Sequence, residues 1–440
     1  MKDYSYLQIR LGRQLRVLLF VYLLSEAPFS ISVAQDSSNG GFARLEGEYV
    51  SVITDLPSSN ELQQLPMVFD TAMPTWCEYF DTSAQRVRKW HVDAHIMLER
   101  ARFESAGLIP PEIAQFPYGF QYGDRVWVVE QPSEYYRRHL LLHEGTHWFM
   151  NKRFGGNGPP WLMEGFAEWL GTHRWDGKSL EMGIIPKTRD EVPYWGRILL
   201  IKQQLAEGVA PSLETILRYD GRAHQQVEAY AWSWAVVVFL MHHPDSQAAF
   251  RNMLKEPMRS DMTLTRWLFE HTQHSWPRLR AAWCAFLSDL DYGYDMSLPL
   301  LQLSEAPKKL ASPQVFELQT NLSWQPTGIK VEKGQHVSIH CDGHYTVVAS
   351  DSNLDTPAWE STAAGVTLEY HNGRPLGELT MAIASPFEQE QAFSAPLDSM
   401  AVGTMLNLSA PQSGEIVFRV NELQGDLTDN QGVLQIAIAP

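Results

Sequence analysis

Between residues 45 and 295, short β-rich runs come first along the chain and apolar positions with helical spacing follow. The β-rich runs predict strands at Glu48–Thr54, Trp90–Leu98 and Arg125–Glu130. The helical patterns predict helices at Asn60–Phe80 with interruptions near Pro66 and Pro74, and at Tyr135–Phe154, Trp161–Leu170, Trp195–Glu207, Ala223–His242 and Leu264–Leu287. Strands that precede helices in this way indicate an α+β domain.

The pattern changes after a polar, proline-containing stretch at residues 303–314. Beyond it, the segments Val337–Cys341, Ile416–Val420 and Leu434–Ile438 alternate between apolar and polar with period two, and glycines and prolines separate them. Such alternation is typical of an all-β sandwich. We therefore predict two domains, residues 35–302 and residues 315–440, with a linker at residues 303–314.

The first 34 residues are typical of a secretory signal peptide. Arg10, Arg13 and Arg16 precede an apolar run at Val17–Leu24, and Ser32-Val33-Ala34 offers small residues for cleavage. The run is much shorter than the roughly 20 residues that a transmembrane helix needs. An ordinary amphipathic helix is the alternative interpretation. The pattern predicts a secreted or extracytoplasmic protein without a transmembrane span.

Charge and cysteine content narrow the set of partners. The chain of 440 residues has a formal net charge of −16, which argues against nucleic acid, because phosphate binding needs clustered Lys and Arg. The three cysteines, Cys77, Cys284 and Cys341, permit one disulfide in an oxidising compartment. Cys77 with Cys284 is the favoured pair because both lie in one predicted domain, and free buried thiols fit equally well.

The first chemical signal is an H-E-x-x-H motif, His143-Glu144-Gly145-Thr146-His147, inside a predicted helix. Residues four apart lie above one another on a helix, so His143 and His147 can reach one zinc ion. Glu144 lies on the same side and can accept a proton from an attacking water. The motif by itself also occurs by chance.

A second predicted helix sharpens this interpretation. It carries Glu164 and Glu168, again four residues apart, after a loop rich in Gly and Pro. If the two helices pack antiparallel, Glu164 can supply the third zinc ligand, and Glu168 can accept the free N–H of a ligating histidine. The alternative is two solvated charges on a helix surface.

Together, HEGTH and PPWLMEGFAEWLG resemble the gluzincin metallopeptidases, the clan of thermolysin and aminopeptidase N, and most closely their peptidase-MA type. The resemblance covers about residues 45–295 and implies a zincin-like fold that hydrolyses peptide bonds. Two features depart from the aminopeptidases. The 16 residues between His147 and Glu164 are fewer than usual, and the G-A-M-E-N element that anchors a substrate amine is absent.

The resemblance also implies a hydrogen-bond donor for the oxyanion and an edge strand that binds substrate. Tyr230 lies 66 residues after Glu164, near where gluzincins place a Tyr or His donor. A core aromatic is the alternative role for Tyr230, and Tyr219 and His224 are competing donors. Arg125–Glu130 is the predicted edge strand, onto which an extended peptide would add; a buried strand is its alternative.

Within residues 315–440, two segments resemble the PA-I type galactophilic lectin, a calcium-binding β-sandwich: Trp324–Gly334 and Asn421–Gly432. The resemblance implies calcium ligands at Glu422, Asp429 and Asn430, with Asp426 where that family uses a backbone oxygen. Such hard oxygen ligands suit calcium. The resemblance also implies carbohydrate binding, whereas a polar turn in a domain that only packs or spaces is the alternative.

These observations predict a secreted zinc metallopeptidase that acts on peptide or protein substrates and carries a carbohydrate- or surface-binding domain. Two alternatives stay open. One is a non-enzymatic adhesin or lectin with a vestigial zincin domain, against which the intact Glu144 argues. The other is a zinc hydrolase with a substrate other than protein.

Overall fold

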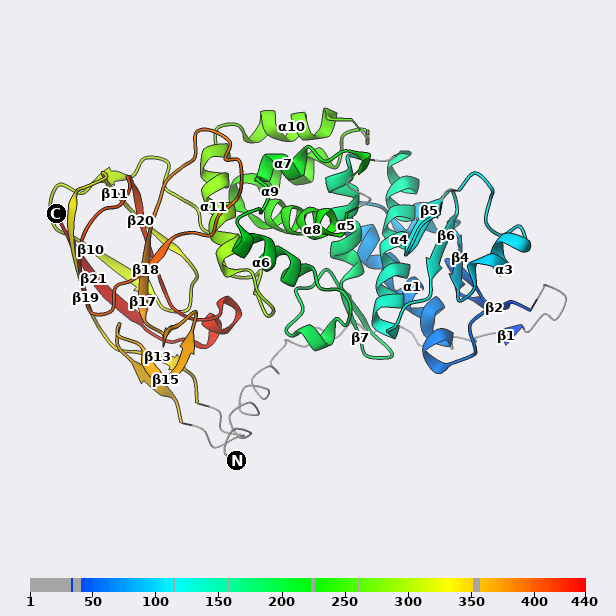
Figure 1. Ribbon diagram of the computed structural model, residues 1–440, viewed down its shortest axis with the longest axis horizontal. Helices are drawn as coiled ribbons and strands as arrows, with labels where there is room; N and C mark the ends of the chain where they lie inside the picture. Colours follow the sequence, from blue (N-terminus) through cyan, green and yellow to red (C-terminus); the bar gives the residue numbers. More distant parts are fainter. Residues whose placement is uncertain are drawn as a thin grey trace. The chain divides into compact units, whose positions relative to one another are not determined.

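The computed structural model describes residues 33–34, 41–113, 115–156, 158–222, 226–259, 261–350 and 357–440 (Figure 1). Most of the predicted signal peptide, residues 1–32, lies outside the described residues. The chain forms two compact units. The first, here called the helical unit, comprises the described residues of Ile31–Gln302 together with Pro386–Leu397. The second, the sandwich unit, holds Leu303–Ser385 and Asp398–Pro440.

The helical unit begins with a six-stranded sheet in the order β1-β2-β3-β4-β6-β5. Its strands are β1 (Val33–Ala34), β2 (Ala43–Glu46), β3 (Val50–Thr54), β4 (Val92–Met97), β5 (Gly119–Tyr122) and β6 (Arg125–Val129). The central strands β3, β4 and β6 are parallel, and β5 pairs antiparallel with β6. These three parallel strands correspond to the β-rich runs predicted at Glu48–Thr54, Trp90–Leu98 and Arg125–Glu130.

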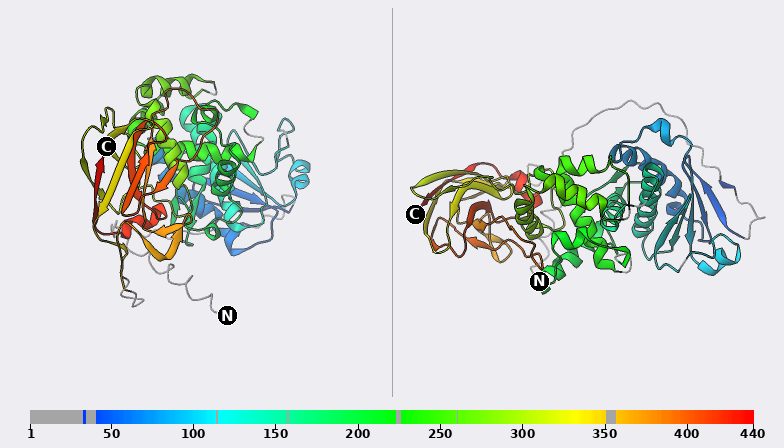
Figure 2. Two further views of the ribbon diagram at one scale, coloured as in Figure 1. Left: turned by 60° about the vertical axis from the view of Figure 1, so that its left-hand side comes forward. Right: turned by 90° about the horizontal axis from the view of Figure 1, so that it is seen from above.

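Helices follow the sheet and form the rest of the helical unit. They are α1 (Asn60–Tyr79), α2 (Ala84–Val87), α3 (Arg100–Ser105), α4 (Glu134–Phe154), α5 (Pro160–Gly171), α6 (Arg197–Glu207), α7 (Leu213–Leu217), α8 (Val227–His242), α9 (Pro244–Met253), α10 (Thr263–Thr272) and α11 (Trp276–Asp289), with a 3₁₀ turn at Arg189–Glu191 and a hairpin of β7 (His173–Trp175) and β8 (Leu180–Met182). α1 and α4 pack against the sheet (Figure 2). An α+β arrangement of this kind is what the sequence predicted.

Two helix predictions need correction. α1 runs without interruption through Pro66 and Pro74, because its buried apolar face, which includes Phe69 and Trp76, compensates for the lost backbone hydrogen bonds. The helix predicted at Leu264–Leu287 is two helices. The second begins at Trp276 with Pro277 in its first turn, where the missing N–H has no intrahelical partner to lose.

Of the two cysteine states that the sequence left open, a Cys77–Cys284 disulfide or free thiols, the structure has free thiols, and Cys341 is free as well. Cys77 lies in α1 and Cys284 in α11, and membership of one unit does not by itself bring two sulfurs to the short separation that a disulfide requires. Burial raises the pKa of the Cys284 thiol to about 11, so this side chain is an inert thiol at neutral pH.

In its described residues, the sandwich unit is all β apart from one 3₁₀ turn, η4 (Gln424–Asp429). Its strands are β9 (Lys308–Lys309), β10 (Gln314–Gln319), β11 (Gln325–Val331), β12 (His336–Asp342), β13 (Tyr345–Val348), β14 (Trp359–Ser361), β15 (Val366–His371), β16 (Arg374–Leu376), β17 (Leu379–Ala384), β18 (Ser399–Ala401), β19 (Met405–Ser409), β20 (Gly414–Val420) and β21 (Val433–Ala439). They form sheets β10-β21-β12-β19 and β18-β17-β20-β11-β9, with two small hairpins. The three predicted alternating segments are β12, β20 and β21.

Two segments differ from simple domain boundaries. The stretch predicted as a linker, residues 303–314, contributes β9, which pairs with β11 of the sandwich unit. Residues 386–397, between β17 and β18, belong to the helical unit. There the Ser394 hydroxyl accepts a hydrogen bond from the Trp283 indole at 2.9 Å, and Glu390 forms an ion pair with Arg218. The helical unit is therefore completed by a segment from late in the chain.

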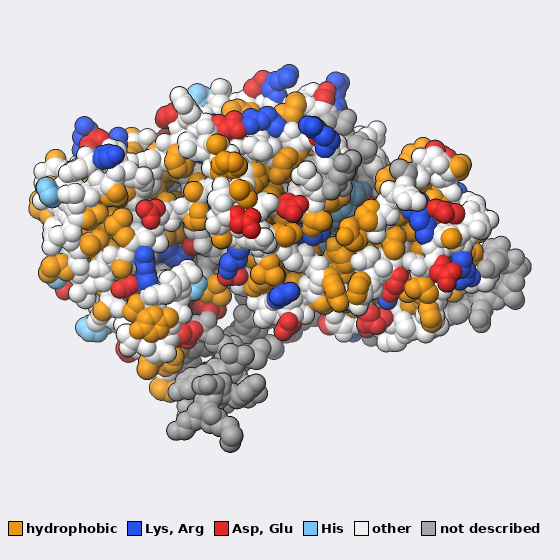
Figure 3. Space-filling model, viewed as in Figure 1, with side chains coloured by type: hydrophobic (Ala, Val, Ile, Leu, Met, Phe, Trp, Pro, Cys, Tyr) orange, Lys and Arg blue, Asp and Glu red, His pale blue; other side chains and the backbone are white. Residues whose placement is uncertain are grey.

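Two features relate to the predicted absence of a nucleic-acid partner and of a transmembrane span: the surface charge and the apolar length of the helices. Acidic and basic side chains are interspersed on the face shown in Figure 3. No helix in the described part of the chain is long and apolar enough to cross a membrane.

Candidate metal centre

α4 presents its histidines along one face. Ser133 caps its N-terminus by accepting a hydrogen bond from the Tyr136 N–H at 3.0 Å, and Gly155 ends the helix in the left-handed region at φ 74°. Between these caps, His139, His143 and His147 recur every four residues and are stacked along the helix. The two predicted ligands therefore face the same neighbour, which is α5.

α5 runs antiparallel to α4 and packs between α4 and α8. The direction follows from the contacts, because His147 meets Glu164 while His139 meets Glu168. Gly165 permits the close approach to α8, since a Cβ there would overlap the backbone of Ser233. All residues of α5 are buried, so Glu164 and Glu168 are interior carboxylates and not solvated surface charges.

Three predicted ligand atoms meet at one point. His143 Nε2 lies 3.2 Å from His147 Nε2 and 3.2 Å from Glu164 Oε2, and His147 Nε2 lies 3.4 Å from Glu164 Oε2. Two ligands that each lie about 2.1 Å from one tetrahedral ion are about 3.4 Å apart. The three atoms thus have the mutual separations that a tetrahedral metal ion requires, and the residues fit zinc.

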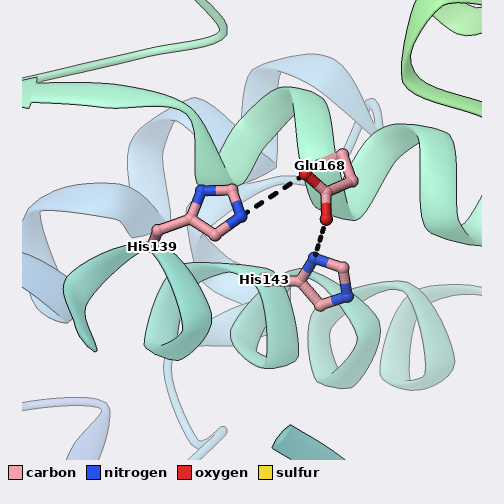
Figure 4. A group of neighbouring side chains, drawn as sticks. All are labelled: His139, His143 and Glu168. Atoms are coloured by element: carbon pink, nitrogen blue, oxygen red, sulfur yellow. Dashed lines mark ion pairs between the residues drawn. The ribbon is translucent and has the colours of Figure 1, made fainter. Parts of the chain in front are cut away.

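A second group of possible ligands overlaps the first. It consists of His139, His143 and Glu168. Figure 4 shows the Glu168 carboxylate reaching from α5 toward both imidazole rings of α4, with Oε2 3.4 Å from His139 Nε2 and Oε1 3.5 Å from His143 Nδ1. His143 therefore faces Glu164 with one ring nitrogen and Glu168 with the other.

The surroundings of Glu168 distinguish the two groups. Its carboxylate accepts hydrogen bonds from Arg197 Nε at 3.0 Å, from Arg197 Nη2 at 2.9 Å and from the Trp195 indole at 3.2 Å. Burial opposes the charged form of Glu168, but Arg197 and then His139 outweigh it and hold the pKa well below its usual range. Because a guanidinium already balances this carboxylate, an added cation there would meet another cation. The group of His143, His147 and Glu164 is the better metal site.

The candidate base, Glu144, lies against an edge strand that the sequence did not predict. A Cβ on Gly119 of β5 would overlap the Glu144 carboxylate, so the two are in close contact. The predicted edge strand, Arg125–Glu130, is flanked on both sides, by β4 and by β5. That prediction was wrong because the four-residue β5 follows in the sheet order although it precedes β6 in the chain. The open edge beside Glu144 belongs to β5.

The candidate oxyanion donor lies close to the ligand histidines. The Tyr230 ring centroid is 6.0 Å from that of His143. Burial, followed by the negative charges of Glu164 and Glu144, raises the pKa of Tyr230 above its usual value. Of its two competitors, Tyr219 packs against the main hydrophobic core, and His224 lies outside the described residues.

The predicted calcium residues lie in and around η4. Glu422 and Asn430 are buried and in contact, with Asn430 Nδ2 donating to Glu422 Oε2 at 2.9 Å. Asp426 and Asp429 lie in the turn between them, and Asp429 accepts a hydrogen bond from the Ala349 N–H at 3.4 Å. The structure therefore brings Glu422 and Asn430 together.

Sequence reasoning missed three residues of the site. His139 follows the same four-residue spacing as His143 and His147, so its position was readable. Arg197 and Gly119 had no such signal, because each comes from an element whose place beside α4 and α5 depends on the whole fold.

Comparisons with known proteins add little to this geometry. No family model matches the chain, and no curated protein sequence matches it. Among solved structures, it is similar to the EclA N-terminal domain, described as a PllA-like lectin, at 14% identity, 31% coverage of this chain, 98% of that one and a TM-score of 0.22. It is also similar to an aminopeptidase N family protein from Idiomarina loihiensis, with 8% sequence identity and a TM-score of 0.23. That match covers 89% of this chain and 68% of the other. Neither likeness bears on function, which is inferred below from the side chains.

Proposed function

We propose that this chain is a zinc metallopeptidase that cleaves internal bonds of extended peptides. His143, His147 and Glu164 hold the metal, and Glu144 is the general base. The observation that carries the proposal is the meeting of three ligand atoms at 3.2 to 3.4 Å, beside a carboxylate that lies against an open sheet edge.

The donor set suits zinc in a catalytic role. Two imidazoles and one carboxylate are a donor set typical of catalytic zinc sites and would hold the metal through three protein ligands. Zinc supplies Lewis-acid polarisation of the scissile carbonyl and makes an attacking water more acidic. Glu168 lies behind His143, with Oε1 3.5 Å from Nδ1, and an N–H at Nδ1 directed to that carboxylate would leave the lone pair of Nε2 for the metal.

Glu144 performs the proton transfers. It follows His143 directly in α4, so its carboxylate lies beside the ligand face. As general base it takes a proton from the attacking water and then delivers that proton to the nitrogen of the leaving amine. Because Glu144 also touches Gly119, these transfers occur where β5 would hold the substrate backbone.

The β5 edge offers backbone groups to a substrate. The Val129 N–H donates to the Tyr118 carbonyl at 2.7 Å, and Gly119 faces Val128 in the next pair of the ladder. Hydrogen-bonded and non-bonded pairs alternate in an antiparallel ladder. The N–H and C=O groups of Gly119 and Gln121 therefore point away from β6, where an extended peptide can add as a further strand.

The same strand favours internal bonds over chain ends. On the face of β5 toward α4 lie Gly119, which has no side chain, and Gln121, whose amide oxygen accepts a hydrogen bond from Asn151 at 2.6 Å. Neither residue carries a charge that would bind a terminal ammonium or carboxylate. This agrees with the missing amine anchor in the sequence.

Tyr230 is the proposed oxyanion donor. Its raised pKa keeps the hydroxyl protonated at neutral pH, so the O–H can donate to the oxygen that becomes negative when the carbonyl is attacked.

For the sandwich unit we propose that Glu422, Asp429 and Asn430 bind calcium through their side-chain oxygens and that Asp426 contributes a backbone oxygen. We also propose that carbohydrate binds beside that site. One observation favours a cation. Asn430 Oδ1 is buried and has no hydrogen-bond partner among the described residues, while its Nδ2 group is used by Glu422 and the Thr320 carbonyl. An amide oxygen next to a buried carboxylate suits calcium. We further propose that residues 1–34 direct secretion and are removed, together with the two-residue strand β1 at the end of the sheet order.

A mixed peptide library tests the proposed function. The chain from residue 35 should cleave internal bonds as read by mass spectrometry, lose this activity on metal chelation and regain it with zinc. Gly119→Ala should abolish cleavage because the added methyl displaces Glu144. Gly221→Ala, where a Cβ meets nothing within 4 Å, is the matched control and should remain active. A zinc-loaded chain that cleaves no peptide would contradict the proposal and favour a non-protein substrate or a non-enzymatic role.

A further inference from the structure

We propose that Arg197 is a positioning residue that holds the Glu168 carboxylate in the orientation required by the ligand His143. This inference rests on the proposed function, because it concerns the same metal site. Arg197 is the first residue of α6, it is buried, and no ligand motif in the sequence points to it.

The Glu168 carboxylate lies closer to Arg197 than to either histidine. The two bonds from Arg197 measure 2.9 and 3.0 Å, whereas the approaches of His139 and His143 measure 3.4 and 3.5 Å. A bidentate guanidinium fixes both the position and the plane of a carboxylate. The orientation of Glu168 is therefore determined by Arg197, and the histidines meet a carboxylate that is already held in place.

Arg197 also balances negative charge around the candidate metal position. Glu144, Glu164 and Glu168 place three carboxylates around the candidate metal position, and all three are buried. A divalent ion balances two of them, and Arg197 balances the third. If Arg197 were lost, the buried Glu168 would be an uncompensated negative charge and would compete for the ion, which would alter the acceptor that faces His143 Nδ1.

The turn before α6 places Arg197 beside Glu168. Tyr194 has φ 70° and Gly196 has φ 59°, both in the left-handed region. A non-glycine residue in that region is uncommon and costs free energy. Between and after these residues, Trp195 and Arg197 both donate to Glu168. The strained turn thus places two donors on one carboxylate.

The same guanidinium also reaches the other side of the site. Its central carbon lies 5.9 Å from the centroid of the Tyr230 ring, and Nη2 lies 3.4 Å from the Tyr136 hydroxyl. A cation over an aromatic ring attracts it and restricts its orientation. Arg197 therefore links the residue behind the metal ligand to the proposed oxyanion donor.

The helical unit contains a matched control. Glu214 accepts hydrogen bonds from the Trp276 indole and from Arg280 Nε, as Glu168 does from Trp195 and Arg197, although Arg280 makes one bond to its carboxylate where Arg197 makes two. Among the described residues, no histidine forms a hydrogen bond or ion pair with Glu214. Arg280→Lys therefore weakens a partly buried ion pair without touching the metal site.

The test is zinc affinity, measured by chelator competition with the full mature chain. Arg197→Lys keeps the charge but loses the bidentate geometry, and should weaken zinc binding by about 10- to 100-fold. It should also change the visible absorption spectrum of the cobalt-substituted protein. Arg280→Lys should lower the melting temperature, because it weakens a partly buried ion pair, but should leave zinc affinity and the cobalt spectrum unchanged.

A double-mutant cycle tests whether Arg197 acts through Glu168. Glu168→Gln should itself weaken zinc binding, and Arg197→Lys should then have little further effect. Equal losses from Arg197→Lys in both backgrounds, or unchanged zinc affinity in Arg197→Lys, would overturn the inference while leaving the proposed function intact. A parent chain that binds no zinc would overturn the proposed function and this inference together.

Discussion

The two regions predicted to bind metal ions differ in how the fold fixes their ligands. In the helical unit, His143, His147 and Glu164 project from two long antiparallel helices, and their ligand atoms already lie 3.2 to 3.4 Å apart. In the sandwich unit, the predicted ligands Glu422 and Asn430 flank a 3₁₀ turn, and they meet through a hydrogen bond.

Periodic elements convert sequence spacing into geometry more directly than turns do. A four-residue interval on a helix always stacks two side chains, so only the pairing of α4 with α5 was left to infer. In a turn, the same interval permits many arrangements, and the direction of each oxygen depends on local backbone torsions.

The largest effect is expected at the catalytic base of the helical unit. Glu144→Gln removes the proton acceptor but keeps the shape of the side chain, so kcat should fall by about 10²- to 10⁴-fold. Zinc content and melting temperature should match those of the parent, because Glu144 is not a ligand. Full peptidase activity in this variant would show that the base lies elsewhere.

The next effect concerns Tyr230. Tyr230→Phe removes one hydroxyl and almost no volume, and loss of one oxyanion donor costs about 10²- to 10³-fold in rate. We expect kcat and kcat/KM to fall by similar factors, since the interaction forms only in the transition state. Zinc affinity should be unchanged. Activity equal to that of the parent would make Tyr230 a core aromatic, and Tyr219 and His224 would be tested next.

For the sandwich unit, calcium should raise the temperature of unfolding. Binding to the folded state alone adds about 2.7 kcal/mol when the free ion is at 100 times its dissociation constant. Asn430→Leu removes the unpartnered amide oxygen and should abolish this increase in scanning calorimetry of the mature chain. A melting profile that is indifferent to calcium in the parent would refute the calcium site and leave the zinc site untouched.

The smallest effect separates the two units by pH. His95 is buried in the helical unit, where burial lowers its pKa to about 4, whereas His336, His340 and His344 of the sandwich unit are exposed. A histidine with a lowered pKa contributes stability above its unfolded pKa of about 6.5 and loses it as pH falls toward its folded pKa. By pH 5, the helical unit should lose about 2 kcal/mol from His95.

His95→Phe tests this pH effect. Stacking on Trp127 can be retained by a phenyl ring, so the variant should fold, and its stability should vary less between pH 7 and pH 5 than that of the parent. Metal-free protein should be used, so that protonation of ligand histidines does not contribute through zinc release. An identical pH dependence in parent and variant would be inconsistent with a buried neutral His95.

Much of the fold was predictable because apolar periodicity reports burial. α4 and α5, the parallel strands β4 and β6, and the alternating strands β12, β20 and β21 all carried such patterns. β5 did not, since four residues are too few to show a period, and its pairing with β6 depends on a non-local contact. The continuous α1 was missed because tertiary packing outweighed the local effect of Pro66 and Pro74.

The candidate site divides in the same way. His143, His147, Glu164 and Glu168 follow from two motifs, and the structure brings the four residues together. The residues that support them come from elsewhere in the chain. Arg197 lies 29 residues beyond Glu168, and its partner could not be inferred without the path of the loop between α5 and α6.

The most direct test of the central claim is the zinc content of the purified mature chain and of its ligand variants, measured by elemental analysis. We predict about one zinc per chain, lost in both His143→Ala and Glu164→Ala but retained in His139→Gln, with circular dichroism confirming that each variant is folded. Stoichiometric zinc in both His143→Ala and Glu164→Ala would contradict the assignment of this centre.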